Sequence, residues 1–179
     1  LKGYDTLIRA TGLAAKEIPN IRTVIVGEAE EIRKDYLEAL KKLVADLGLA
    51  DRVVFAGPQT KVAECLSLAD VVVSSNTRKP EAFGRSMAEA LAMNRPVVAT
   101  RFGGALDIVK DGVNGKFVEV VPDGPEAPAK RAAEFAAAIV AVSKMSFDDL
   151  RAPILEKFSF NRMIELSLET YRELATNNS

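Results

Sequence analysis

The sequence predicts an α/β fold in which a doubly wound parallel sheet carries helices on both faces. Short runs of apolar, mostly β-branched residues show no polar alternation, which is typical of strands buried on both faces. These runs alternate with segments of helical periodicity, and parallel strands need such crossovers between them. The loops that follow the runs should therefore begin at a common edge of the sheet.

Apolar periodicity and end signals place the individual elements. The expected strands cover residues 23–27, 52–57, 70–74, 96–100 and 115–118. The expected helices cover residues 4–18, 32–47, 62–66, 84–93, 103–109, 128–143 and 159–175, with one more that begins near residue 146. Gly48 is expected to close the second helix in a left-handed conformation, and Ser146 and Ser159 are expected to cap the last two helices.

Composition limits the classes of function that this chain of 179 residues can serve. A hydrophobic fraction of 48% and a charged fraction of 27% are typical of one soluble globular domain. The net charge of −1 gives no electrostatic footprint for nucleic acid, and no apolar run approaches the roughly 18 residues of a membrane span. With one Cys and no His, the chain forms no internal disulfide and no Ser-His or Cys-His nucleophile system.

The carboxyl ends of the predicted strands define the candidate site, because open α/β sheets bind ligands outside those ends. Gly27, Gly57, Ser75 and Thr100 follow four of these strands. Gly84 opens a helix at the same edge, and the first N–H groups of a helix lack partners and carry the positive end of its dipole. Such a helix start suits a diphosphate.

Two carboxylates, Glu81 and Glu89, flank this helix start. Glu89 is expected to point away from the apolar face of the helix, where an acceptor-only carboxylate suits the paired hydroxyls of a ribose. Glu81 would face whatever lies beyond the diphosphate. A plainer interpretation stands beside this one: Glu81 can be an ordinary turn residue, and Arg85 with Glu89 can form an exposed i, i+4 ion pair.

A longer pattern surrounds the two carboxylates. It consists of Pro-Glu-Ala-Phe-Gly-Arg-Ser-Met-Ala-Glu-Ala-Leu-Ala at residues 80–92, Arg-Pro-Val-Val-Ala-Thr at residues 95–100, and Gly103-Gly104. Lys-Gly-Tyr-Asp at residues 2–5 extends it toward the N-terminus. In order and spacing, this pattern resembles the donor-binding C-terminal half of family 4 glycosyltransferases, the retaining "group 1" enzymes of GT-B fold, whose donor half is Rossmann-like.

The resemblance implies a role for each matching position. Glu81 resembles the catalytic-site Glu that contacts the donor sugar, and Glu89 resembles the Glu that holds the ribose. Lys2 resembles the Lys that neutralises the diphosphate. The other donor-binding positions that the resemblance implies lie near the sugar, the diphosphate and the base: Gly27, Gly57, Pro58, Phe83, Gly84, Arg85 and Ser86.

The resemblance also implies what the whole protein does. It would transfer a hexose from a nucleotide-diphospho-sugar, with UDP, GDP or ADP as the nucleotide, to a hydroxyl acceptor with retention of configuration. No metal and no cofactor are expected, because Lys2, an upstream Arg and the helix start would meet the diphosphate. An N-terminal acceptor domain would belong to the same parent chain. The location would be cytoplasmic, with that domain able to attach to the inner membrane face.

Departures from the family pattern lead to further expectations. The first donor-half strand and its Arg would precede Leu1, so residues 1–179 are expected to be a fragment of one nucleotide-sugar-binding domain, inactive alone. The sheet is expected to have a gap between the strands that end at Gly27 and Ser74, where two copies could pair as a homodimer. Ala29 replaces a family Gly. The terminal helix, residues 159–175, resembles one that crosses to the acceptor half, which would leave its apolar face partly uncovered here.

Two other classes of function remain open at this point. A non-catalytic nucleotide- or sugar-binding module would keep the site without the chemistry. A dinucleotide-dependent oxidoreductase would use a related sheet, although no Gly-x-Gly-x-x-Gly loop follows any predicted strand. Gly103-Gly104, Arg78 and Lys79 are lesser candidates for donor contacts, with a helix-opening turn and a solvated loop as the plainer interpretations.

Overall fold

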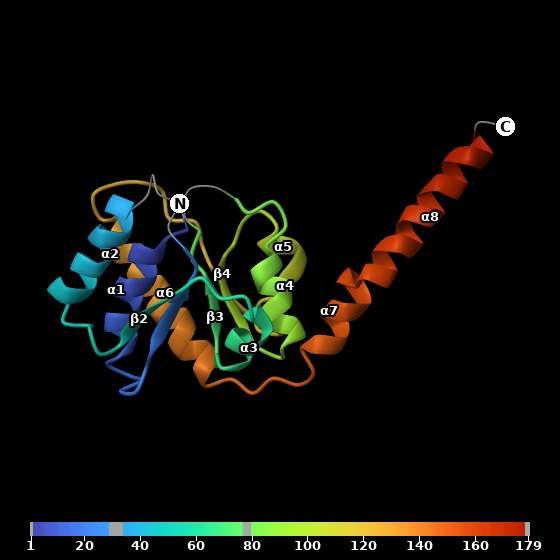
Figure 1. Cartoon of the computed structure of the whole chain (residues 1–179). Coiled ribbons are helices and arrows are strands. Elements are labelled where there is room, and N and C mark those ends of the chain that lie inside the picture. The colour runs from blue at the N-terminus through green and yellow to red at the C-terminus, as the bar shows by residue number, and fades with distance from the viewer. Residues whose placement is uncertain (1, 29–33, 77–79, 178–179) are drawn as a thin grey trace.

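The computed structural model describes residues 2–28, 34–76 and 80–177, and in these residues helices enclose parallel strands on both faces (Figure 1). The prediction of a doubly wound, Rossmann-like α/β fold is therefore confirmed. The described strands are β1 (Thr23–Val26), β2 (Val53–Gly57), β3 (Val72–Ser74), β4 (Val97–Thr100) and β5 (Gly115–Val118). The described helices are α1 (Tyr4–Ala14), α2 (Lys34–Asp46), α3 (Val62–Ser67), α4 (Arg85–Ala92), α5 (Ala105–Ile108), α6 (Ala127–Ser143), α7 (Arg151–Phe158) and α8 (Phe160–Asn177).

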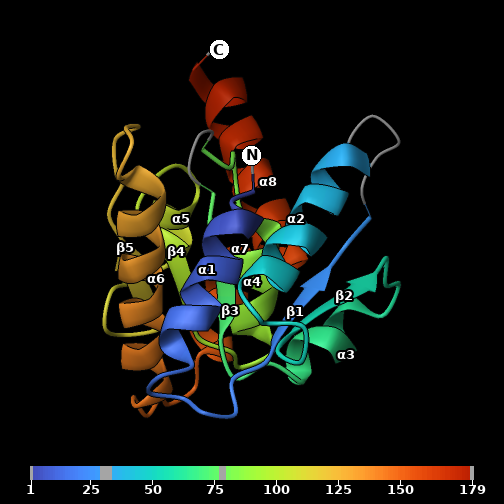
Figure 2. The same cartoon turned by 90° about the vertical axis from the view of Figure 1, so that its left-hand side faces the viewer.

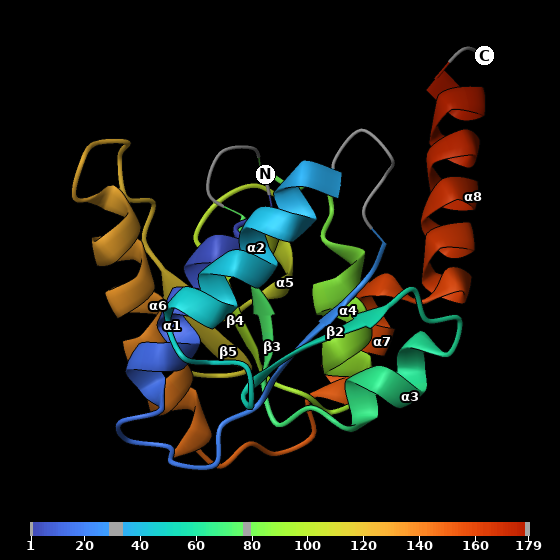
Figure 3. The same ribbon diagram turned by 60° about the vertical axis from the view of Figure 1, so that its left-hand side comes forward.

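The parallel strands form two sheets rather than the one sheet that the sequence predicts. β1 pairs with β2, and the other three strands follow the order β3-β4-β5. Among the described residues β1 and β3 share no ladder, so the sheets are separate at the position where the resemblance places a gap. The alternation of strands and helices indicates the fold class, but it does not say which strand edges pair. Figure 3 shows that β1 and β3 nevertheless end toward the same edge of the molecule.

Helices pack on the two faces of the β3-β4-β5 sheet through alternate residues of the same strands. α1 and α6 lie side by side on one face (Figure 2), where Val98 of β4 belongs to a buried cluster with Leu7 and Phe135. α4 and α5 cover the other face, where Val97 and Ala99 of β4 are fully buried. This double coverage explains why β4 reads as a continuous apolar run.

The β1-β2 sheet is attached to the rest of the molecule through α1. Ile8 of α1 is fully buried in a cluster with Ile25 of β1, Val53 of β2 and Leu40 of α2. α2 closes as predicted: Gly48 follows its last turn with a left-handed φ of 65°. The expected beginning of α2, near Ile32, lies outside the described residues.

The predicted helix near Ser146 begins later in the structure, at Arg151. Asp149 provides the cap that was expected from Ser146, because its Oδ1 accepts the N–H groups of Arg151 at 2.9 Å and Ala152 at 3.0 Å. The preceding segment does not continue the helix, since the N–H of Leu150 donates to Asn94 Oδ1 at 2.9 Å. For α8, the Ser159 Oγ accepts the N–H of Arg162 at 3.2 Å, in keeping with its predicted capping role.

α8 projects away from the body of the molecule (Figures 1 and 3). Its apolar side chains are largely uncovered, with Phe160 at 70%, Leu168 at 47% and Tyr171 at 69% exposed. None of the helices in the described part of the chain is long and apolar enough to cross a membrane.

Candidate functional site

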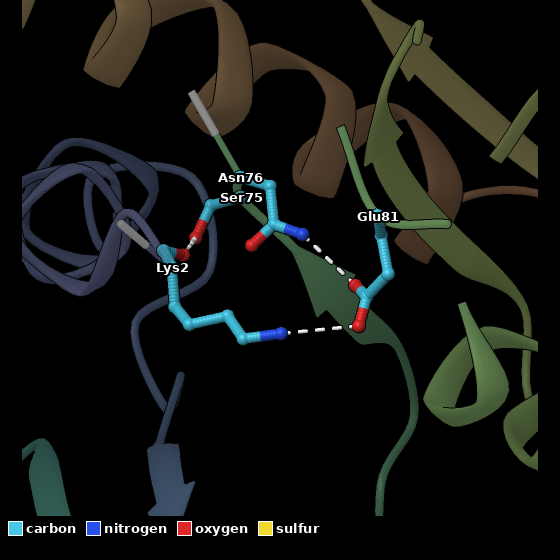
Figure 4. Close-up of polar contacts among 4 residues, drawn as sticks. All are labelled: Lys2, Ser75, Asn76 and Glu81. Atoms are coloured by element: carbon cyan, nitrogen blue, oxygen red, sulfur yellow. Dashed lines mark hydrogen bonds and ion pairs between the residues drawn. The ribbon is translucent and has the colours of Figure 1, made fainter. Parts of the chain in front are cut away.

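The carboxylate of Glu81 is the centre of a polar cluster at the carboxyl end of β3 (Figure 4). Lys2 Nζ donates to Glu81 Oε1 at 3.0 Å, and Asn76 Nδ2 donates to Glu81 Oε2 at 2.9 Å. The three side chains come from three segments, one before α1, one after β3 and one before α4. The structure therefore brings together Lys2 and Glu81, which the sequence analysis assigned to one site.

Gly3 and Ser75 place Lys2 beside Glu81. Gly3 has a left-handed φ of 69°, and a Cβ there would lie 1.8 Å from the backbone oxygen of Ser75. Only glycine permits this approach of the α1 start to the end of β3. The Ser75 hydroxyl lies 3.0 Å from both Lys2 O and Gly3 O and can donate to either (Figure 4). The backbone of Lys2 is thus attached to the strand that also carries Asn76.

Asn76 is the site residue that the sequence analysis did not single out. It is only 8% exposed, and its amide reaches the carboxylate across the cluster. A buried amide needs a partner of this kind, because an unpaired buried polar group costs free energy. The signal in the sequence was its place directly after a buried strand, next to Ser75.

The N-terminus of α4 is open toward the same edge. Gly84 precedes it with a left-handed φ of 89°, and no side chain caps the helix. Arg85 and Ser86, which begin the helix, are exposed. The first N–H groups of α4 are thus placed to meet an anion, as the sequence predicts.

Glu89 lies on the exposed face of α4 and has no ion pair with Arg85 among the described residues. The ion pair of the plainer interpretation is not formed in this structure, and the roles of both residues stay predictions. Both line a pocket of about 220 Å³ between α4 and α7, together with Phe83 and Phe158. The side chains of Arg85 and Glu89 remain free to meet a ligand.

Gly27 and Gly57 lie together at the ends of β1 and β2, and the N–H of Gly27 donates to Gly57 O at 3.0 Å. Both have positive φ, 142° and 67° respectively, and Pro58 follows Gly57 directly. In the described part of the chain, no hydrogen bond or ion pair joins these residues to the Glu81 cluster. The expectations for Ala29, Arg78 and Lys79 lie outside the described residues.

Gly103 and Gly104 support the loop that carries Glu81. The N–H of Gly104 donates to Glu81 O at 2.7 Å, and a Cβ on Gly104 would lie 2.2 Å from Phe83 O. Gly103 has a left-handed φ of 63°, and a Cβ there would lie 2.6 Å from the Cβ of Pro80. The two glycines therefore form a turn against the site loop, which agrees with the structural interpretation of this pair.

The arrangement combines an ammonium group, open helix N–H groups and acceptor-only carboxylates, a set that suits a ligand with both phosphates and hydroxyls. Among the described residues, no group of three or more His, Cys, Asp and Glu side chains could hold a metal ion. The expectation of a metal-free site stays a prediction.

Tyr36 of α2 lies near Asp5 at the start of α1. Burial and the Asp5 carboxylate raise the pKa of the Tyr36 hydroxyl, which stays protonated at neutral pH.

Residues 1–137 match the family model of glycosyl transferases group 1. A D-inositol 3-phosphate glycosyltransferase of Acidothermus cellulolyticus is 33% identical over an alignment of 187 positions, gaps included, and this alignment covers 97% of the present chain. The chain spans 38% of the length of that relative.

Solved structures of glycosyltransferases are also similar to this chain. HepE of Anabaena, in complex with UDP and glucose, matches with a TM-score of 0.73 and 26% identity over 92% of this chain and 44% of that one. The C-terminal domain of LpcC, a glycosyl transferase group 1 family protein of Francisella tularensis, matches with a TM-score of 0.61 and 26% identity. That match covers 79% of this chain and 77% of the other.

Proposed function

Because the chain belongs to the glycosyl transferases group 1 family, we propose that it is the donor-binding half of a retaining glycosyltransferase. The whole enzyme would transfer a hexose from a nucleotide-diphospho-sugar to a hydroxyl acceptor. In that step the bond between the sugar and the diphosphate would break and the nucleoside diphosphate would leave with the bonding electrons. The acceptor oxygen would form the new bond to the sugar with retention of configuration, and its hydroxyl proton would pass to the departing diphosphate.

The observation that carries the proposal is the cluster of Lys2, Asn76 and Glu81 beside the uncapped start of α4. A diphosphate would take up the N–H groups at Arg85 and Ser86 and would compete with Glu81 for Lys2. Charge-assisted donors of this kind stabilise the negative charge that develops on a departing diphosphate. Glu81 would then be released to accept hydrogen bonds from hydroxyls of the sugar, and Glu89 would accept those of the ribose.

The remaining parts of the proposal concern the whole protein. The acceptor would bind to a separate domain of the parent chain, since this chain spans 38% of its curated relative. We propose that the reaction needs no metal. The isolated chain would bind nucleotide weakly and transfer no sugar. The whole protein would act in the cytoplasm, with its acceptor domain attached to the inner membrane face. Pairing of two copies through the gap between β1 and β3 is a further proposal.

Calorimetric titration of the chain with UDP, GDP, ADP and NAD tests the proposed class of ligand. We expect one of the three nucleoside diphosphates to bind. NAD should not bind, because the sequence contains no Gly-x-Gly-x-x-Gly loop of the kind that binds dinucleotides. Binding of NAD alone would favour an oxidoreductase. Sugar transfer by the isolated chain would contradict the proposal that this chain binds only the donor and needs a separate acceptor domain.

Glu89→Ala tests the proposed ribose contact. The change should weaken binding of the preferred nucleotide by about 1–3 kcal/mol, the usual cost of losing hydrogen bonds to a charged group. Glu169→Ala is the matched control, because it removes the same charge from an exposed position on α8. Equal affinities of the Glu89→Ala variant and the unaltered chain would refute the role in ribose binding.

A further inference from the structure

The aromatic ring of Phe83 contacts a ring from a distant part of the chain. Its centroid lies 5.2 Å from that of Phe158, with the two planes at 80°, an edge-to-face arrangement. Phe83 lies in the site loop between Glu81 and Gly84, and Phe158 is the last residue of α7. The ring pair therefore connects the loop at the candidate site to the helix that packs against α4.

Phe158 is a firm support because α7 is anchored just before it, at Ile154 and Lys157. Ile154 of α7 is 6% exposed and belongs to the core cluster of α4 and β4. Lys157 Nζ lies 4.9 Å from the centroid of the Phe158 ring and donates to Asp107 O at 2.8 Å. The cation thus holds the ring in place from the side of α5.

The site loop has less support at Phe83 than at Glu81. Glu81 is fixed through its backbone oxygen by Gly104 and through its carboxylate by Lys2 and Asn76. Phe83 is 41% exposed, and the residue that follows it is a glycine with a φ of 89°. The backbone of this segment packs against Gly104, and the ring pair of Phe83 with Phe158 adds a side-chain contact between Glu81 and α4.

We propose that Phe158 is a positioning residue of the donor site, which acts by holding the Phe83 ring and, through it, the loop from Glu81 to Gly84. This inference rests on the proposed function for its effect on donor binding. Groups that are held in the binding geometry beforehand cost less ordering when the ligand arrives. Phe158 would therefore raise donor affinity without contacting the donor.

Three variants of the chain test the link. Phe158→Leu keeps an apolar side chain of similar size but removes the ring edge. Phe158→Tyr keeps the ring. Leu155→Ala is the control for loss of an apolar side chain from α7 in the exchange measurement, since Leu155 lies on α7 and lines the same pocket as Phe158 but has no ring to pair with Phe83.

Hydrogen exchange measured by NMR gives a readout that does not depend on any ligand. The N–H of Gly104 donates to Glu81 O at 2.7 Å and that of Met87 donates to Gly84 O at 2.9 Å, so both report on the loop. We expect exchange of these two amides to become about 2- to 10-fold faster in Phe158→Leu, the range that corresponds to one aromatic pair. Phe158→Tyr and Leu155→Ala should leave both rates unchanged.

Titration with UDP-glucose gives the functional readout, and its dissociation constant should rise about 2- to 10-fold in Phe158→Leu but not in Phe158→Tyr. If the unaltered chain binds neither UDP nor UDP-glucose, the titration is made with whichever of GDP and ADP binds, and binding of none of the three would contradict the proposed function, while the exchange rates still test the link. Unchanged exchange in Phe158→Leu would overturn the inference, and so would an equal acceleration in Leu155→Ala, which would indicate general loosening of α7.

Discussion

At the scale of single residues, Glu81 shows how a site depends on partners that are remote in the sequence. One carboxylate oxygen is bound by Lys2 and the other by Asn76. Lys2 reaches Glu81 because glycine at position 3 lets the chain touch the backbone of Ser75. The role of Asn76 could not be predicted, because nothing in a linear pattern states that a short amide after a strand will face a particular carboxylate.

Asn76→Asp tests this contact with almost no change of shape. At pH 7 the new carboxylate would stand beside that of Glu81 without a donor between them, and we expect a loss of about 1–3 kcal/mol in the free energy of unfolding. The repulsion favours uptake of a proton by the folded variant. The folded variant then binds more protons, so its deficit should shrink as the pH falls from 7 toward about 5.

Urea unfolding followed by circular dichroism at both pH values measures this effect. Asn161→Asp is the control, because Asn161 is exposed on α8 and has no carboxylate pair to form with Glu81; it should change stability by less than about 0.5 kcal/mol. A deficit of Asn76→Asp that is the same at pH 7 and pH 5 would show that repulsion by Glu81 is not its cause.

At the scale of elements, the site loop is held between the Gly103-Gly104 turn and the beginning of α4. The loop and the turn approach so closely that a Cβ on Gly104 would meet Phe83 O at 2.2 Å. Backbone cannot yield as a flexible side chain can, so the two segments fit only when this position is glycine. The turn thus helps the site by shape, without any need to contact a donor.

Gly104→Ala should therefore destabilise the protein by overpacking, by about 1–3 kcal/mol in urea unfolding. The φ of Gly104 is −59°, so the backbone conformation itself suits alanine and the cost is steric. Gly124→Ala is the control, since no atom lies within 4 Å of its added Cβ and its φ is not in the left-handed region. Equal stability of the two variants would show that the loop moves aside at no cost.

At the scale of the whole molecule, the fold divides into a compact body and the projecting α8 (Figure 1). α8 follows α7 at Ser159 and contacts that helix, while its apolar side chains stay largely exposed. The resemblance to a helix that crosses to an acceptor half stays a prediction, in agreement with this uncovered face. The stability of the body should depend on α7 but not on α8.

Two truncations test that division. A chain that ends at Ser159 should keep the free energy of unfolding of the full chain within about 0.5 kcal/mol, because the removed side chains are exposed. A chain that ends at Leu150 also loses Ile154, which is 6% exposed in the core, and should be less stable by about 2–5 kcal/mol. Circular dichroism during urea unfolding measures both, and a large loss on removal of α8 alone would contradict its separate status.

The sequence by itself determined the fold class, most element boundaries and the region of the site. Apolar runs and helical periods indicate which residues are buried, and so which segments form strands and helices. Gly48 has the left-handed conformation that its place at the end of a helix indicates. The family pattern then named Lys2, Glu81 and Glu89 as parts of one site.

Only the tertiary structure decided which strand edges pair, which side chains meet and which positions are supports. The split into two sheets, the amide of Asn76 on Glu81 and the ring of Phe158 on Phe83 all join segments far apart in the chain. Periodicity indicates which face of each segment is buried, but it does not indicate which other segment packs against that face. Contacts of this kind are set by packing in three dimensions, where one glycine at position 3 or position 104 decides whether two segments can touch.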